Sequence, residues 1–134
     1  MPTQGGVYIV LREATRAGEF LEHNLGGRFK QRDPSVSADV LRARWVEDCQ
    51  VVYIGKGDHI RRRVKQYADF GVGKPVGHWG GRYIWQLADS AQLLVAWKAC
   101  GSEETAAMMK ARLLRRFKEE HAGRLPFANI SDPT

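Results

Sequence analysis

The sequence predicts an α+β fold built on one small sheet of about three strands. Three observations predict it: apolar runs rich in β-branched and aromatic residues at 5–11 and 51–54, a further run at 93–97, and helical periodicity after the second and third runs. At 134 residues the chain is long enough for one core and short for two. We therefore expect a single domain spanning 1–134.

The first two strands frame a long insertion. Residues 5–11 form a nearly continuous apolar run, typical of a strand buried on both faces, and residues 51–54 form the second strand. The segment at about 12–50 shows no strong strand pattern, and Ser37 is the predicted N-cap of a helix that ends near Trp45. We expect a helical and loop-like insertion packed on the edge of the domain.

A turn and a short helix follow the second strand. Gly55 and Gly57 interrupt the strand pattern, Asp58 is the predicted N-cap, and apolar residues then recur at helical spacing. The loop at 70–82 is dense in glycine and contains His78, which a simple linker does not need. Because binding residues often lie on such loops, His78 is a candidate substrate-binding residue.

The rest of the chain predicts a third strand and a long helix. Residues 83–87 and 93–97 flank a short polar connection and are expected to pair as a hairpin, the second run completing the sheet. Ser102 is the predicted N-cap of the long helix, and Gly123 ends it. Lys110 falls on the apolar face of this helix, so its ammonium either reaches the sheet edge or points into a polar site.

The composition favours a polyanionic partner. The formal net charge is +6 and the isoelectric point is about 9.6, which suits a surface that attracts phosphates. Cys49 and Cys100 are isolated and in no metal-ligand spacing, as expected of reduced thiols in a cytoplasmic protein. Neither a signal peptide nor a long apolar run is visible, so we expect no membrane association.

The turn after the second strand is the strongest candidate site. It holds Tyr53, Lys56 and Arg63 close together, because Arg63 lies early in the following helix and can reach back to the strand end. A phenol, an ammonium and a guanidinium at a glycine-rich turn favour phosphate binding. On these residues alone, a glycine turn followed by a solvated basic helix is an equal alternative.

An ordered set of motifs resembles the GIY-YIG nuclease family. The motifs are Gly6-Val7-Tyr8, then Tyr53-Ile54-Gly55-Lys56, then Arg63, and, after a long helix, Leu125-Pro126-Phe127-Ala128-Asn129. The likeness covers nearly all of the chain outside the insertion. A long insertion also separates the two tyrosine motifs in a subset of stand-alone family members. It implies a three-stranded antiparallel sheet flanked by helices and hydrolysis of DNA phosphodiester bonds that depends on Mg²⁺ or Mn²⁺.

The resemblance also implies roles for single residues. Tyr8 and Tyr53 would lie in the active site, where one of them positions or deprotonates the attacking water. Lys56 would assist that deprotonation or hold the phosphate, Arg63 would bind the scissile phosphate, and Asn129 would support the site. Further DNA contacts are expected from the turn and from basic residues of both helices: Gly55, Arg61, Arg62, Lys65, Arg112, Arg115 and Arg116.

One position departs from the family pattern. Family members carry a metal-binding glutamate on the long helix, three residues before a pair of aliphatic residues, and counting back from Leu113-Leu114 gives Lys110. A protonated lysine does not bind a hard cation. Glu103, expected about two helical turns earlier on nearly the same face, is a weak candidate for a replacement carboxylate.

Two functions follow from this departure. The first, our leading expectation because the other motif positions are intact, is a metal-dependent endonuclease that recruits Glu103 or another carboxylate, such as Glu104, Glu47 or Asp48. The second is a catalytically silenced DNA-binding module that needs no metal, in which Lys110 supplies the positive charge. A third alternative is that Lys110 replaces an acidic residue of a parent protein. A fourth, from a different class, is a structural protein-interaction domain.

Overall fold

A three-stranded antiparallel sheet organises the computed structural model, which describes residues 2–13, 17–26, 32–74 and 79–131. β1 (Gly6–Leu11) is the central strand, β2 (Val51–Gly57) pairs with one side of it and β3 (Leu94–Ala99) with the other. Helix α1 (Ala38–Arg44) lies in the chain between β1 and β2. The predicted α+β class, the antiparallel sheet and the helix within the insertion are confirmed.

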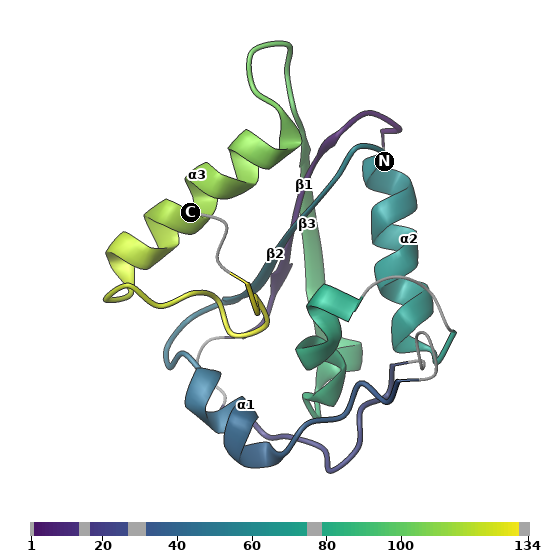
Figure 1. Cartoon of the computed structure of the whole chain (residues 1–134), viewed down its shortest axis with the longest axis vertical. Helices are drawn as coiled ribbons and strands as arrows, with labels where there is room; N and C mark the ends of the chain where they lie inside the picture. Colours follow the sequence, from purple (N-terminus) through teal and green to yellow (C-terminus); the bar gives the residue numbers. More distant parts are fainter. Residues whose placement is uncertain (1, 14–16, 27–31, 75–78, 132–134) are drawn as a thin grey trace.

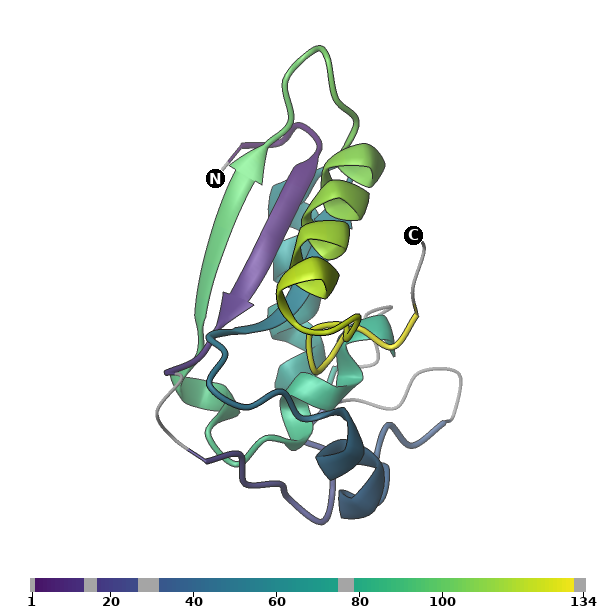
Figure 2. The same ribbon diagram turned by 90° about the vertical axis from the view of Figure 1, so that its left-hand side faces the viewer.

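Helices α2 (Ile60–Gly71) and α3 (Ala106–Glu120) cover opposite faces of the sheet (Figure 1). Successive residues of β1 point to the two faces: the ring of Tyr8 lies 6.1 Å from that of Tyr67 in α2, whereas Val7 and Ile9 share a hollow with α3 residues. Figure 2 looks onto the sheet from the α3 side and shows β3 at its outer edge. Both helices contact β2, from the two faces of the sheet.

Helix α3 begins three residues later than predicted. Its N-cap is Thr105, whose Oγ1 accepts a hydrogen bond from the Met108 N–H at 3.1 Å, and not Ser102. Both residues are good caps, and the burial of Ala106 against the sheet favours the later one. Glu103 consequently precedes the helix instead of lying in its first turn.

Helix α2 also has a different cap from the predicted one. The side chain of His59 accepts a hydrogen bond from the Arg62 N–H at 3.1 Å, so His59 is the N-cap and Asp58 lies one residue outside. The shift leaves the helix in the predicted register, and Arg63 lies in its first turn.

The predicted hairpin of residues 83–87 with 93–97 is wrong. Residues 83–86 belong to a 3₁₀-helical segment, η1 (Trp79–Gln86), followed by η2 (Ser90–Gln92), and β3 pairs with β1 instead. Gln86 supplies the physical reason. Its buried amide donates to the carbonyls of Leu21 and Val36 and accepts from the Val36 N–H, which ties this segment to the insertion.

The C-terminal tail closes the free edge of β2. The Ala128 N–H donates to the Val52 carbonyl at 2.8 Å, and the side chain of Asn129 bonds to Ile54 farther along the same edge. Because an open strand edge invites pairing with other chains, the tail both satisfies and protects this one.

The insertion holds the tail in place and is part of the core. Arg44, at the end of α1, donates to the carbonyls of Phe127 and Asn129. The rings of Trp45 and Phe127 pack edge to face with centroids 5.1 Å apart, and Leu41 is completely buried. The expectation that the insertion merely packs on the domain edge is therefore wrong, because its residues fix the segment that covers β2.

Candidate functional site

The phenol rings of Tyr8 and Tyr53, from neighbouring strands, pack together beside Gly55. Tyr8 of β1 lies opposite Gly55 of β2, and its ring centroid is 5.9 Å from that of Tyr53. The two hydroxyls are hydrogen-bonded to each other. A Cβ on Gly55 would lie 2.3 Å from Cζ of Tyr8, so the ring has room only because position 55 is glycine.

A third phenol borders this pair and was missed by the sequence reasoning. Tyr67 of α2 lies with its ring centroid 6.1 Å from that of Tyr8, and it is buried. Its helical spacing after Ile60 and Val64 fits a member of an apolar stripe equally well. The signal that identifies it is its spacing, since it follows Arg63 by four residues and so lies one turn later on the same helix face.

The phenols are neutral near pH 7. Burial is the largest cause that raises the pKa of Tyr8 well above its ordinary value, and burial also raises the pKa values of Tyr53 and Tyr67. The charge of Arg63 acts in the opposite direction on the pKa values of Tyr8 and Tyr53 without cancelling the rise. Neutral phenols are hydrogen-bonding groups rather than bases.

Arg63 extends from the first turn of α2 beside the end of β2. It is half-buried, and its Nη1 donates to Oε1 of Gln66 at 2.9 Å. A Cβ on Gly57 would lie 2.7 Å from Cβ of Arg63, so the second glycine of the turn allows the helix to approach the strand. The strand, turn and helix therefore bring the guanidinium near Tyr53, as the spacing predicts.

Lys110 reaches this region from α3, on the other face of the sheet. Its side chain is half-buried; burial lowers the pKa of its ammonium, and the charges of Lys56 and Arg63 lower that pKa further. Lys56 itself is exposed near the end of β2. We call Lys56, Arg63 and Lys110 the cation cluster. Within the described ranges, the charged groups that act on the Lys110 ammonium are these two cations, Lys56 and Arg63.

Glu103 does not join the cation cluster. It is exposed in the loop before α3, so its expected position on the helix face of Lys110 is wrong. With Asp58 and Glu104 it borders a separate hollow of about 320 Å³, and none of the three cluster residues lines that hollow. The carboxylate of Glu104 is already paired with Arg112 at 3.0 Å.

The residues of this site do not fit a Mg²⁺ or Mn²⁺ ion. Such ions prefer oxygen ligands, whereas Lys110 occupies the expected glutamate position and its charged neighbours are cations. Glu47 and Asp48 are exposed and precede β2, at the end of that strand away from Lys56. Within the described parts of the chain, no group of three or more His, Cys, Asp or Glu side chains is arranged to hold a metal ion.

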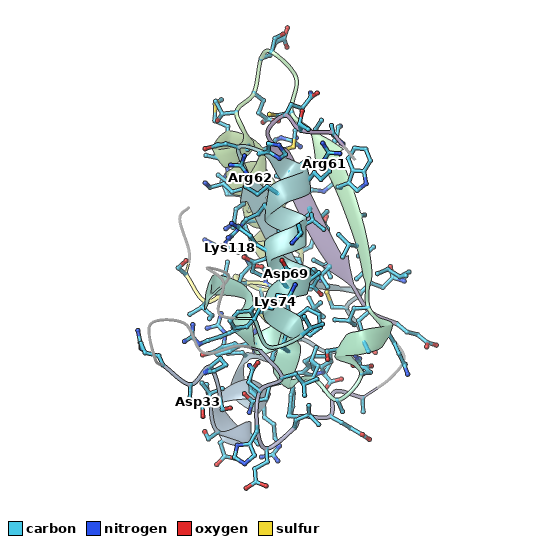
Figure 3. All side chains as sticks on the ribbon, turned by 90° about the vertical axis from the view of Figure 1, so that its right-hand side faces the viewer. Asp33, Arg61, Arg62, Asp69, Lys74 and Lys118 are labelled. Carbon is cyan, nitrogen blue, oxygen red and sulfur yellow. The ribbon has the colours of Figure 1, made fainter. Side chains whose placement is uncertain are left out.

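The predicted DNA contacts on α2 lie outside the cation cluster. Arg61 and Arg62 are exposed at the start of the helix (Figure 3). Lys65 is exposed one turn later, and its Nζ forms an ion pair with Asp69 at 2.6 Å. His78 lies outside the residues that the structure describes.

The predicted contacts on α3 are exposed, and two of them have intramolecular partners. Arg112 pairs with Glu104 at 3.0 Å and Arg116 with Glu120 at 3.2 Å, while Arg115 is exposed. Exposed ion pairs of this kind are weak, so these arginines can exchange partners at little cost.

Asn129 fixes the part of β2 that lies between Tyr53 and Gly55. Its side chain is buried; Oδ1 accepts from the Ile54 N–H and Nδ2 donates to the Ile54 carbonyl, both at 2.9 Å. A single side chain thus makes the two hydrogen bonds that a neighbouring strand would make. Asn129 supports the strand that carries the phenol and the glycine without itself belonging to the cation cluster.

Asn129→Ala is expected to lower the free energy of unfolding by about 2 kcal/mol, because it leaves two buried backbone groups of Ile54 unpaired. Chemical denaturation measures the change. Ser131→Ala, at an exposed position just beyond, is the control and should leave the midpoint unchanged. Equal midpoints for both variants would rule out this role of Asn129.

Comparisons with known proteins find no match. Neither the models of protein families nor the curated protein sequences match this chain, and no solved structure does either. Among the described residues, no helix combines the length and apolar character needed to cross a membrane.

Proposed function

We propose that this chain is a GIY-YIG-like DNA-binding module that holds a backbone phosphate at the cation cluster without a metal ion. The position of Lys110 carries the proposal. Its ammonium lies where the family resemblance expects a metal-binding carboxylate, and the charges that act on it are those of Lys56 and Arg63.

The charge balance of the cluster supports an anionic ligand. Three neighbouring cations repel one another, and burial makes the charged form of Lys110 still less favourable. A phosphate relieves this repulsion and accepts hydrogen bonds from guanidinium, ammonium and phenol groups. The choice of DNA rests on the resemblance and on the net charge of +6.

A metal-dependent endonuclease is the second candidate. The close approach of Tyr8 and Tyr53 to Arg63 favours it, because the resemblance gives these three residues catalytic roles. Hydrolysis by this route would also need a carboxylate for Mg²⁺ or Mn²⁺, which the described part of the cluster does not offer.

Arg63→Ala is expected to weaken binding of a labelled DNA duplex about tenfold, because a charge-assisted contact to phosphate is lost. Fluorescence anisotropy measures the affinity. The slope of log affinity against log salt should become shallower by about one unit, since one fewer counterion is released.

The matched control is Arg42→Ala, which removes an exposed arginine of α1 that is paired with Asp39. It should bind DNA like the unaltered chain. Thermal unfolding of both variants separates loss of contact from loss of fold, and Arg63→Lys should bind with intermediate affinity. Undiminished DNA binding by a folded Arg63→Ala variant would refute the proposed function.

A further inference from the structure

β3 is the most exposed strand of the sheet. Both helices pack chiefly on β1 and β2, and within the described ranges no strand or tail pairs with the outer edge of β3, which Figure 2 shows open. β3 pairs with β1 in one unbroken register, so no bulge bends this edge away. The edge of β2, by contrast, is covered by the C-terminal tail. An open, regular edge is a template for another strand.

The side chains of β3 are apolar on both faces of the sheet. Opposite residues of paired strands point to the same face, so Trp97, opposite Tyr8, lies on the α2 face, and Leu94 lies on the α3 face. Leu94 is 70% exposed and Trp97 is 46% exposed. Large apolar side chains gathered on an open edge indicate an interaction surface.

A hollow of about 190 Å³ lies beside β3 on the α3 side. Most of its lining is apolar and comes from β1, β3 and α3, and Lys98 and Arg112 complete it. Arg112 already donates two hydrogen bonds to the carboxylate of Glu104, both at 3.0 Å. The hollow therefore suits an apolar side chain better than a phosphate.

We propose that the open edge of β3 pairs with β3 of a second copy of this chain, antiparallel and about a two-fold axis. In the register that places Ala96 opposite its own counterpart, Trp97 lies opposite Val95 of the second copy. Aromatic and β-branched residues form favourable cross-strand pairs. Lys98, the single charged residue of β3, lies opposite a leucine, so the two copies of this lysine are kept apart.

The same register explains the exposed leucine. Leu94 lies opposite Lys98 of the second copy on the α3 face, beside the hollow that this lysine lines. The two-fold axis repeats the contact, so each copy offers one leucine and one hollow. Because one strand supplies both the protruding side chain and the place that receives it, a second copy is favoured over an unrelated strand.

Sedimentation velocity over a dilution series tests the pairing. We expect a monomer–dimer equilibrium with a dissociation constant on the order of 10 μM, because a single pair of short strands is a small interface. Raising the salt concentration should strengthen the dimer, since each copy carries a net charge of +6 and salt screens the repulsion. DNA binding changes in the opposite direction with salt, so the two associations are separable.

Leu94→Lys should weaken the dimer at least about tenfold, because it places a second ammonium opposite Lys98 of the other copy. The exposed position should let this variant fold, which thermal unfolding checks. Adding Lys98→Glu should restore the dimer, because opposite charges then face each other across the strand pair. Val40→Lys, at an exposed apolar position of α1, is the matched control and should dimerise like the unaltered chain.

A chain that stays monomeric throughout the dilution series would overturn the inference. So would a dimer that persists in a folded Leu94→Lys variant, or one that dissociates as salt is raised, which would indicate a bridging nucleic acid. If the double variant did not recover, the register and the seating of Leu94 would be wrong. Weaker DNA binding by Trp97→Ala in a chain that stays monomeric would overturn the pairing and assign this face to nucleic acid.

Discussion

Gly55→Ala is expected to lower the free energy of unfolding by about 3 kcal/mol or more, which is a large part of the stability of an ordinary domain. The added Cβ would lie 2.3 Å from Cζ of Tyr8, whose ring is fully buried between the sheet and α2. Neither the ring nor the strand can move without disturbing Tyr53 and Tyr67. Chemical denaturation measures the loss.

Gly101→Ala is the matched control for this substitution. A Cβ at position 101 meets no atom within 4 Å, so this variant should be as stable as the unaltered chain. If Gly55→Ala unfolded at the same denaturant concentration as Gly101→Ala, the close packing of Tyr8 against β2 would be refuted.

Lys110→Glu is expected to weaken DNA binding in EDTA about a hundredfold, because it replaces an attractive charge by a repulsive one at the half-buried phosphate site that we propose. The new carboxylate would face Lys56 and Arg63, which stabilises its charged form, so the variant should remain folded. Addition of Mg²⁺ should restore part of the affinity, since the carboxylate offers an oxygen ligand.

The control for this charge reversal is Lys98→Glu, at an exposed position of β3 outside the cation cluster. It should weaken binding far less and show no recovery with Mg²⁺. Plasmid nicking in the same buffers adds the test of chemistry. If the Lys110→Glu variant cleaves and the unaltered chain does not, the chain is a nuclease scaffold silenced at one residue. Cleavage by the unaltered chain would favour the second candidate function, a metal-dependent endonuclease.

The fold was largely predictable from local patterns. The wrong hairpin prediction shows where such patterns are insufficient. β1 and β2 follow from apolar runs with β-branched residues, and the helices from apolar spacing, although the predicted N-caps Asp58 and Ser102 were each displaced. Residues 83–87 form a short apolar run that suits a strand or a helix equally. The structure decides through the buried amide of Gln86, whose partners Leu21 and Val36 lie far away in the sequence.

The site was predictable where its parts are close in sequence. Arg63 comes beside Tyr53 because one turn joins their helix and strand. The electrostatic surroundings of Lys110 were not predictable, because they depend on Lys56 of β2 and Arg63 of α2, which are far from Lys110 in the sequence. Asn129 is a similar case, since its contact with Ile54 spans 75 residues of sequence.

The central claim is that a lysine ammonium, and not a metal ion, completes the phosphate site. The most direct measurement is the affinity of the unaltered chain for a DNA duplex, first in EDTA and then in Mg²⁺ at constant ionic strength. We predict full binding in EDTA and no gain with Mg²⁺. Binding that appears only when Mg²⁺ is present would contradict the claim.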